Sequence, residues 1–565
     1  MGSSSAISLL GVLTLLYLFS FSSSAIHSPV PAADICHSTT SPSFCKAFLP
    51  NSLATVHSHC RFTLRHALAH ARSFLALVNT HLALFPSLAA LHDCRSLAAA
   101  NLDFLSNTFP TVNTTTTTTT TNALPFYKAD EMVSLLSAVI TNENTCYEGL
   151  LSSGSGSGSG SVDKVLKAIS FDTKLYSLYL SLFKMGWVSN DVKAPHVPKM
   201  KHFGRGKGQL KLNMSPKNRA YYERLMHRRK PPARRLLQTN SNEDDGILVN
   251  GIVAVDPNGT YDFTTINAAI QAAPNNSVAA DGYFLIFVTA GVYNESVMVP
   301  KHKKYVLMIG EGNNQTIITG RKNVPDGSTT FNSGTVIVEG TGFFGVNLTI
   351  TNTAGPNKFQ AVALRVSADM TTFYSCIFEG YQDTLYPHSL RQFYRECDIY
   401  GTIDFILGDA AVVFQNCNIY ARLPMKGQYI VITAQGRTDP NQNTGISIHN
   451  CTIKPTAQLA ATPTIKSYFG RPWKEYARTV YMQSFIDAFI DPAGWNVWDG
   501  TLNLNTSYYA EFNNSGPGSD TSRRAKWAVG LINATVANNF TVSPFLGGDQ
   551  WLPPTTVPYT GGLIS

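Results

Sequence analysis

The chain has few charged residues: only 14% of its 565 residues are Asp, Glu, Lys or Arg. A coiled coil and a disordered acidic protein both need far more charge, so both classes are excluded. Hydrophobic residues make up 44% of the sequence, which is enough for a large core. Since domains usually span about 100–200 residues, the length predicts more than one folded unit.

The sequence also lacks a basic surface spread over a folded region. The net charge is +8, but residues 184–237 alone carry fifteen Lys or Arg and two Asp or Glu, a net of +13. Residues 1–183 are neutral and residues 238–565 have a net charge of −5. A charge confined to one short stretch indicates a linker or processing segment and excludes a nucleic-acid-binding domain.

Metal-ligand spacing is missing as well. The 14 histidines are scattered, and the nine cysteines do not form the closely spaced pairs typical of zinc sites. Five cysteines lie in residues 36–146, an odd number that predicts two disulfides and one spare thiol without giving the pairing. The sequence therefore predicts no metal and no cofactor.

Only one apolar run, at the N-terminus, has the character of a targeting segment. Ile7–Phe21 is followed by the small residues Ser22-Ser23-Ser24-Ala25, which suit cleavage of a signal peptide spanning residues 1–25. The segment lacks a basic start, so an uncleaved membrane anchor is the alternative. Export is also compatible with several Asn-x-Ser/Thr sequons.

Residues 26–183 are predicted to be an all-α domain. Apolar residues recur every three or four positions in residues 56–84 and 162–183, which is typical of amphipathic helices. A Thr tract at 114–121 and a Gly/Ser run at 152–161 are expected to connect helices.

The basic residues 184–237 end in Arg234-Arg235-Leu236-Leu237. One interpretation is a solvated linker with no further role. The other is an unstructured linker that a processing protease cuts at this paired-basic site, separating the helical region from the β-rich region that follows.

A repeat marks the region from about residue 247 onward. Its clearest copies are Phe373-x-x-Cys376-x-Phe378, Tyr394-x-x-Cys397-x-Ile399, Phe414-x-x-Cys417-x-Ile419 and Ile448-x-x-Cys451-x-Ile453. Short apolar strands that recur at about this period predict a parallel β-helix, in which each coil buries its inward residues against the next.

The repeat also predicts a carboxylate pair. Asp383 follows Cys376 by seven residues and Asp404 follows Cys397 by seven, so they should stack on adjacent coils about 4.8 Å apart. Two carboxyls that close titrate as a unit, one protonated and one ionised, which supplies an acid together with a base or nucleophile. Gln360 and Gln382 are candidate donors to an oxyanion. The alternative is a structural ladder of polar side chains.

Arg471 is the candidate counter-charge for this pair, because a guanidinium fork holds a carboxylate ionised and oriented. Trp473 and Trp498 are candidate platforms for sugar rings, with a partly buried structural role as the alternative.

Five blocks then identify a family resemblance. In order they are Gly291-Val292-Tyr293-x-Glu295, Gln360-Ala361-Val362-Ala363-Leu364-Arg365, Gly380-Tyr381-Gln382-Asp383-Thr384-Leu385-Tyr386, Gly401-Thr402-Ile403-Asp404-Phe405-Ile406-Leu407-Gly408 and Gly470-Arg471-Pro472-Trp473. From about residue 247 to residue 553 the chain resembles the plant pectin methylesterases. The resemblance implies a right-handed parallel β-helix with an aromatic-lined cleft, in residues 238–565.

The resemblance also implies roles for the site residues. Asp404 would attack the C6 methyl-ester carbonyl of homogalacturonan, forming an acyl-enzyme and releasing methanol. Asp383 would act as acid and then as base, Gln360 and Gln382 would stabilise the oxyanion, and Arg471 would orient Asp404. Gln360 and Arg471, with Trp473 and Trp498, would also bind the substrate.

Two further implications concern this β-rich region. The resemblance implies a disulfide between Cys417 and Cys451, with Cys376 and Cys397 as stacked thiols. Gly408-Asp409-Ala410 stands where the family usually has Gly-Asn-Ala, and Lys358-Phe359 stands where Gly-His is frequent.

Residues 36–183 resemble the pectin methylesterase inhibitor domain that precedes many of these enzymes. The supporting residues are Cys36, Cys45, Asp93-Cys94 and Thr145-Cys146-Tyr147-Glu148-Gly149. The resemblance implies a four-helix bundle behind a small hairpin, with Cys36 paired to Cys45, Cys94 paired to Cys146, and Cys60 spare. Because the last helix and the Gly/Ser run depart from the pattern, inhibition by this domain stays open.

The leading hypothesis is a secreted, monomeric pectinesterase of the plant cell wall, made as a precursor. Its expected partners are pectin, its own pro-domain or separate inhibitor proteins, and a processing protease. Two alternatives remain: a β-helix polysaccharide depolymerase, because paired carboxylates also suit a retaining glycosidase, and a non-enzymatic inhibitor or pectin-binding protein.

Overall fold

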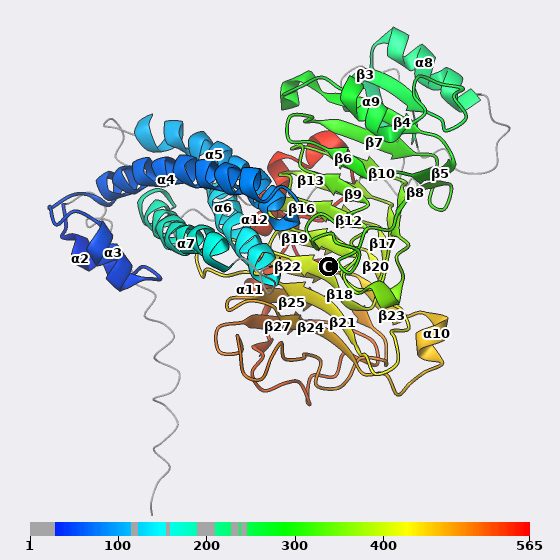
Figure 1. Cartoon of the computed structure of the whole chain (residues 1–565). Helices are drawn as coiled ribbons and strands as arrows, with labels where there is room; N and C mark the ends of the chain where they lie inside the picture. Colours follow the sequence, from blue (N-terminus) through cyan, green and yellow to red (C-terminus); the bar gives the residue numbers. More distant parts are fainter. Residues whose placement is uncertain are drawn as a thin grey trace, which may run out of the picture.

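The computed structural model describes residues 29–114, 123–153, 159–188, 210–227, 237–238 and 246–564. It consists of a helical part and a β-helix that pack side by side (Figure 1). The expected signal peptide, most of the Thr tract, half of the Gly/Ser run, and Arg234, Arg235 and Leu236 of the expected processing site lie outside the described residues.

Four long helices form the predicted bundle: α4 (Val56–Leu84), α5 (Ala89–Thr114), α6 (Phe126–Ser153) and α7 (Ser159–Trp187). Each packs against two of the others in a closed ring, with α4 touching both α5 and α7. The apolar spacing explains the arrangement, because Leu64, Val139 and Leu182 point inward and are at most 1% exposed. The four-helix bundle is confirmed.

A small hairpin of α2 (Ala32–Cys36) and α3 (Pro42–Phe48) precedes the bundle. Its two helices are joined by the Cys36–Cys45 disulfide, while Cys94–Cys146 joins α5 to α6. Cys60 is a buried free thiol. Both predicted pairings and the spare cysteine are confirmed.

Parallel strands build the second part, and they stack into three long sheets. The seven-stranded sheet contains β6 (Val297–Val299), β9 (Val336–Val338), β12 (Leu364–Val366), β15 (Leu385–Pro387), β18 (Ile403–Gly408), β21 (Ile430–Gln435) and β24 (Ser467–Pro472). The eight-stranded sheet contains β5 (Gly291–Asn294), β8 (Thr316–Gly320), β11 (Thr349–Asn352), β14 (Ile377–Glu379), β17 (Asp398–Gly401), β20 (Asn418–Ala421), β23 (Thr452–Pro455) and β26 (Phe485–Ile486).

The third sheet has 13 strands and runs the length of the β-helix. It contains β2 (Leu237–Gln238), β1 (Leu210–Met214), β3 (Ile247–Val255), β4 (Tyr283–Val288), β7 (Val306–Gly310), β10 (Phe344–Val346), β13 (Thr371–Tyr374), β16 (Arg391–Arg395), β19 (Ala411–Gln415), β22 (Gly445–His449), β25 (Arg478–Met482), β27 (Tyr508–Phe512) and β28 (Gly530–Leu531), in that spatial order. Successive turns of the chain add one strand to each sheet, which confirms the predicted parallel β-helix.

The sequence repeat maps directly onto the stacking. Phe373, Tyr394 and Phe414 are paired in register on successive coils, and their rings stack at 5.3 and 4.7 Å between centroids. All three are fully buried. One inward aromatic per coil therefore builds a continuous core.

The expected disulfide between Cys417 and Cys451 is wrong. Both are buried free thiols, as are Cys376 and Cys397, for which stacked thiols were expected. The thiols of Cys417 and Cys451 approach backbone carbonyl oxygens of the preceding coil, Tyr394 O at 3.5 Å and Phe414 O at 3.4 Å. Each sulfur is thus satisfied as a weak hydrogen-bond donor along the helix axis.

Part of the expected linker is folded. Residues 210–227 form β1 and the helix α8 (Pro216–His227), which pack on the N-terminal end of the β-helix, where Figure 1 labels α8 beside β3. Five apolar side chains of this segment, Leu210, Leu212, Met214, Tyr222 and Leu225, are buried, so neither a solvated nor an unstructured linker describes it.

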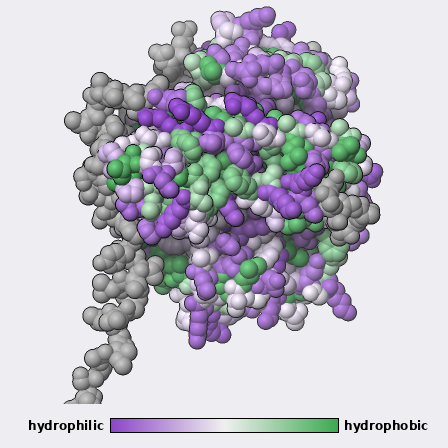
Figure 2. Space-filling model, turned by 60° about the vertical axis from the view of Figure 1, so that its left-hand side comes forward, coloured by the Kyte–Doolittle hydropathy of each residue, from purple (hydrophilic) through white to green (hydrophobic). Residues whose placement is uncertain are grey.

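Four short helices complete the β-helix region: α9 (Ile266–Ala272), α10 (Ala457–Ala460), α11 (Ala534–Asn538) and α12 (Val542–Leu546). α9 closes the N-terminal end of the core with Ile266 and Ile270, both fully buried. Within the described ranges, no helix combines the length and apolar character needed to cross a bilayer. The side turned forward in Figure 2 groups hydrophobic residues between hydrophilic borders.

Candidate active site

Asp383 and Asp404 lie on adjacent coils of the β-helix, as their spacing predicts. The N–H of Asp383 donates to the carbonyl of Ile403 at 3.1 Å, and Leu385 pairs with Ile406. Both aspartates have a positive φ, 63° and 49°, which is rare for residues other than glycine. Such strained backbone persists where the surroundings enforce it, and it often marks functional sites.

Burial raises the pKa of both carboxyls, and Arg471 makes the two differ. Their exposed fractions are only 5% for Asp383 and 4% for Asp404. Burial and the charge of Asp404 raise the pKa of Asp383 well above its usual value, although Arg471 opposes this. Burial also raises the pKa of Asp404, but hydrogen bonds and charge from Arg471 pull it back. The pair therefore holds its proton on Asp383.

Arg471 provides the predicted counter-charge. It reaches Asp404 from β24 with two parallel hydrogen bonds, Nε to Oδ1 at 2.9 Å and Nη2 to Oδ2 at 2.5 Å. Burial acts to lower the pKa of Arg471, but the bonds to Asp404 outweigh it and raise that pKa. This bidentate geometry fixes both oxygens of Asp404 in one orientation.

Both predicted glutamines lie on the same side of the coil. Gln382 precedes Asp383 in the chain, and its carbonyl accepts from the N–H of Ala361, the residue after Gln360. Both side chains are partly exposed. The fold therefore places the two glutamines on adjacent coils, with Gln382 next to Asp383 in the chain.

The two predicted tryptophans are also brought together. The Trp473 and Trp498 rings lie 6.3 Å apart at 29°, and the Arg471 guanidinium lies 4.3 Å from the centre of the Trp498 ring. Both residues are partly buried. They form an aromatic wall beside Asp404.

Two tyrosines at the site were not predicted. The Tyr429 hydroxyl accepts from Nη1 of Arg471 at 3.0 Å, and the Tyr381 hydroxyl accepts from Nη2 of Arg422 at 2.9 Å. Tyr381 lies within the Gly380-to-Tyr386 block, so its place at the site could have been predicted from the sequence. Tyr429 lies in no block, and only the alignment of Val431 with Ile403 places it here.

The helical bundle lies beside the β-helix (Figure 1) and makes hydrophobic contact with β15, β18 and β21 of the seven-stranded sheet. One hydrophobic cluster joins the two parts. From the bundle it includes Phe74, Val78, Leu91 and Leu97, and from the β-helix Phe331, Val362, Tyr386, Leu407 and Ala434, with Trp473 and Trp498 against its edge. The bundle thus reaches the aromatic wall of the site.

Polar contacts accompany this apolar interface. Oδ2 of Asp93 accepts from the Thr329 hydroxyl at 2.5 Å, and Glu148 pairs with Lys474, the neighbour of Trp473. The Thr141 hydroxyl donates to Asp409 Oδ2 at 2.6 Å. Asp409 is one of the two departures from the family pattern named above, and here it is an acceptor at the interface.

Asp409 is fully engaged by donors. Besides Thr141 it accepts from Gln435 at 3.0 Å, from Gln442 at 2.7 Å and from Thr444 at 2.5 Å. A carboxylate offers enough lone pairs for four donors, whereas an amide oxygen offers two. Aspartate therefore suits this position when the bundle is docked.

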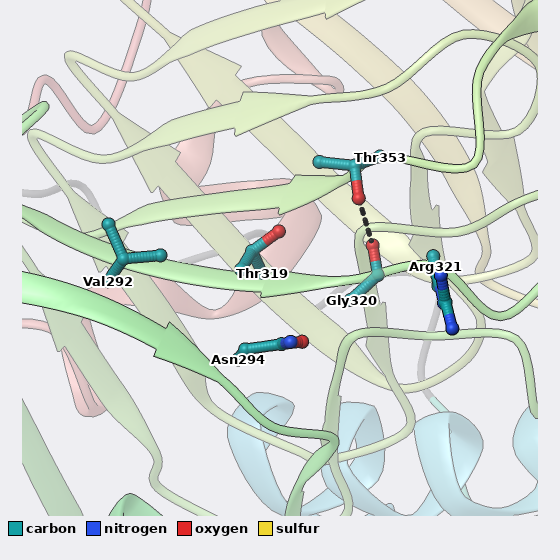
Figure 3. Close-up of a pocket in the computed structure, with 6 residues that line it drawn as sticks. All are labelled: Val292, Asn294, Thr319, Gly320, Arg321 and Thr353. Atoms are coloured by element: carbon teal, nitrogen blue, oxygen red, sulfur yellow. Dashed lines mark hydrogen bonds between the residues drawn. The ribbon is translucent and has the colours of Figure 1, made fainter.

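A separate groove of about 570 Å³ lies on the outer face of the eight-stranded sheet. Figure 3 shows its lining residues Val292, Asn294, Thr319, Gly320, Arg321 and Thr353, with Thr353 Oγ1 donating to Gly320 O at 3.0 Å. It has no carboxylate in its lining and belongs to a different sheet from Asp404, so it is not a second copy of the acid/base site.

Comparison with known proteins gives two family matches. The family model described as Pectinesterase matches residues 250–549, and the one described as Plant invertase/pectin methylesterase inhibitor matches residues 32–182. In the part of the chain that the structure describes, no group of three or more His, Cys, Asp or Glu side chains is placed to hold a metal ion.

Individual relatives agree with these matches. Probable pectinesterase/pectinesterase inhibitor 20 of Arabidopsis thaliana is 50% identical, covering 99% of both chains. Pectinesterase 2 of Citrus sinensis is 50% identical over 63% of this chain and 68% of its own. The solved structure of pectin methylesterase from carrot matches with a TM-score of 0.54 and 50% identity, covering 55% of this chain and 98% of the carrot chain.

Proposed function

The chain belongs to the pectinesterase family and is a pectin methylesterase, and from this premise we propose that it hydrolyses C6 methyl esters of homogalacturonan through Asp404. The observation that carries the proposal is the bidentate contact of Arg471 with Asp404, one coil away from Asp383, whose pKa is raised well above its usual value by burial and by the charge of Asp404. An ionised carboxylate beside a neutral one is the combination that acyl transfer needs.

The first half of the reaction forms the acyl-enzyme. A carboxylate oxygen of Asp404 attacks the ester carbonyl carbon, and the carbonyl π electrons move to oxygen. The side-chain amides of Gln360 and Gln382 donate to this oxyanion. When the tetrahedral intermediate collapses, the bond to the methoxy oxygen breaks. Asp383 gives its proton to that oxygen, so methanol leaves and an anhydride joins Asp404 to the sugar.

The second half restores the enzyme. Asp383, now ionised, takes a proton from water while the water oxygen attacks the sugar carbonyl of the anhydride. The bond to Asp404 breaks, releasing a free Asp404 carboxylate and the demethylated uronic acid, which then loses its proton to solvent. Asp383 again holds the proton, and Arg471 again binds both oxygens of Asp404. Trp473 and Trp498 serve as the stacking wall for neighbouring sugar rings.

We also propose that the bundle keeps the esterase activity of the precursor low. The helical bundle covers the sheet face beside the site, and Trp473 and Trp498 lie against the interface. The proposed organisation is a signal peptide (1–25), this pro-domain, a basic segment (184–237) ending in Arg234-Arg235-Leu236-Leu237, and a catalytic domain (238–565). Secretion to the cell wall and cutting at this site by a processing protease complete the proposal.

The decisive experiment places a recognition site for a sequence-specific protease within residues 189–209 of the full-length chain. Methanol release from highly methylated pectin and new reducing ends are counted together, before and after the cut. We expect methanol without new reducing ends, increasing after the cut and separation of the bundle. New reducing ends without methanol would instead identify a depolymerase. The absence of both products would indicate a binding protein.

The same protein carrying Asp404→Asn tests the nucleophile. Because the amide cannot attack, methanol release should fall by at least about a thousandfold. A loss of less than tenfold would overturn the assignment of Asp404.

A further inference from the structure

The segment at residues 210–227 is held to the β-helix by backbone pairing. β1 inserts between β2 and β3, and it runs parallel to β3 with Leu212 opposite Ile247 and Met214 opposite Val249. A strand added to a sheet edge in this way satisfies backbone donors and acceptors on both partners.

Apolar side chains reinforce the pairing. Leu210, Leu212 and Met214 alternate with less buried residues along β1 and are 2%, 3% and 5% exposed. From α8, Tyr222 and Leu225 are 3% and 4% exposed. All five belong to one hydrophobic cluster with β-helix residues that include Ile247, Val249, Leu285 and Phe287.

Polar and charged groups add to this contact. The Tyr221 hydroxyl donates to Asp262 Oδ2 at 2.5 Å, and the same oxygen accepts from the N–H of Ala254 at 2.8 Å. Residues 210–227 contain four Lys or Arg and one Glu, a net charge of +3, whereas residues 238–565 carry −5. The segment and the region of the chain on which it packs are therefore opposite in net charge.

The expected processing site follows this segment in the chain. Arg234-Arg235-Leu236-Leu237 lies C-terminal to α8, so a cut there would assign β1 and α8 to the pro-piece although they pack on the catalytic domain. We propose that residues 210–227 are a clamp that stays bound to the β-helix after this cut and holds the pro-piece to the enzyme without a covalent link. This inference rests on the proposed function, which includes the cut at this site.

Two engineered cuts test the clamp directly. Protease recognition sites are placed within residues 189–209 and within residues 228–236 of the full-length chain, and both are cut. The peptide that contains the clamp then has no covalent link to either domain. We expect it to co-elute with the β-helix in gel filtration and to appear with it, one to one, in native mass spectra. Separate elution at micromolar concentration would overturn the proposal.

A matched pair of variants tests whether β1 makes the contact. In Met214→Asp a buried clamp side chain becomes charged, whereas in Met226→Asp the change falls on a side chain that is 39% exposed. After both cuts, the peptide should be lost from the first variant and kept by the second. Equal retention in the two variants would overturn the role of β1.

Hydrogen exchange of Ile247–Val249 supplies a second measurement that does not require peptide loss. Amides of this β3 segment should exchange at least about tenfold faster in doubly cut Met214→Asp than in doubly cut Met226→Asp. Equal exchange would contradict the clamp. Methanol release is measured on the same samples. If the peptide is lost while methanol release is normal, the clamp alone is wrong. If the peptide is retained but no methanol is released, the proposed activity alone is wrong.

Discussion

Arg471 binds both carboxylate oxygens of Asp404, with Nε 2.9 Å from Oδ1 and Nη2 2.5 Å from Oδ2. Arg471 comes from β24 and Asp404 from β18, two strands of one sheet separated by β21. This arrangement lowers the pKa of Asp404 against the effect of burial, whereas burial and the charge of Asp404 raise the pKa of its neighbour Asp383 well above its usual value.

Arg471→Lys should impair the reaction although it keeps the charge. An ammonium group cannot bind both oxygens of Asp404 in parallel, so the nucleophile loses its orientation. We expect kcat/KM for methanol release to fall by about a hundredfold. Arg321→Lys, in the groove on the eight-stranded sheet, is the control and should change nothing. A loss of less than about twofold in Arg471→Lys would argue against an orienting role.

Asp383→Asn should lower activity and raise stability. The variant loses the proton donor, so kcat should fall by about 10²- to 10⁴-fold. Because the pKa of Asp383 is raised in the folded protein, the folded state binds this proton more tightly than the unfolded state does. The contribution of Asp383 to the free energy of unfolding is therefore largest at low pH, and it decreases as the pH rises through the folded-state pKa.

The stability part is measured by thermal melting across a pH series. At neutral pH Asp383→Asn should melt at a higher temperature than the parent protein, with the advantage disappearing below about pH 3.9, the usual pKa of aspartate. Asp499→Asn, at an exposed carboxyl, is the control. If Asp383→Asn melted at a lower temperature than the parent at every pH, burial of the ionised Asp383 carboxylate would not destabilise the folded protein.

Thr141→Val should loosen the bundle. The change keeps the side-chain shape and removes the donor that reaches Asp409 at 2.6 Å, which leaves that buried carboxylate short of one hydrogen bond. The expected cost to docking is about 1–3 kcal/mol. Uncut precursor should therefore release methanol faster than the parent, whereas Thr80→Val on the exposed side of α4 should not. Equal basal rates in the two variants would show that this contact does not hold the bundle.

Docking of the bundle should weaken as the pH rises. Burial raises the pKa of Asp93 to about 6, against the opposing effects of Thr329, Arg365 and His92, while Glu339 raises it further. Separation would return this carboxyl to water, where its pKa is about 3.9. The docked state thus binds the proton more tightly, so docking is strongest below about pH 3.9 and weakens as the pH rises through about 6.

This pH dependence is measured as the dissociation constant of the bundle in a precursor cut once within residues 189–209. Asp93→Asn should flatten the profile between about pH 4 and pH 7, because the titrating group is gone. Asp103→Asn is the control, since Asp103 pairs with Lys301 at an exposed edge of the same interface. An unchanged profile in Asp93→Asn would assign the pH dependence to another group.

The fold of both domains could be predicted because its physical cause is periodic. One inward aromatic or cysteine per coil, as in Phe373, Tyr394 and Phe414, indicates a β-helix, and the same spacing aligns Asp383 with Asp404. Arg471 could be proposed as their partner from its block alone. Tyr429 could not, because its place beside Arg471 depends on how two coils align and not on any local pattern.

Two expectations, the Cys417–Cys451 disulfide and the unfolded linker, were wrong. Both depend on which residues become neighbours in space, and the spacing of residues along the chain does not determine that. Cys417 and Cys451 stack on adjacent coils, but their thiols are directed at backbone carbonyls and remain free. Residues 210–227 have the composition of a solvated linker, yet their few apolar side chains match an uncovered edge of the β-helix. Composition reports the average of a segment, whereas packing depends on the surface that the segment meets.

The sequence by itself determined the helical bundle, the β-helix and the order of the polar groups along its coils, because periodic burial of apolar side chains is a local property of the chain. Only the tertiary structure decided that the bundle lies against the catalytic face, that Asp409 accepts from Thr141, and that β1 covers β3. These contacts join residues far apart in the chain, and the free energy that forms them comes from matching surfaces that exist only once each domain has folded.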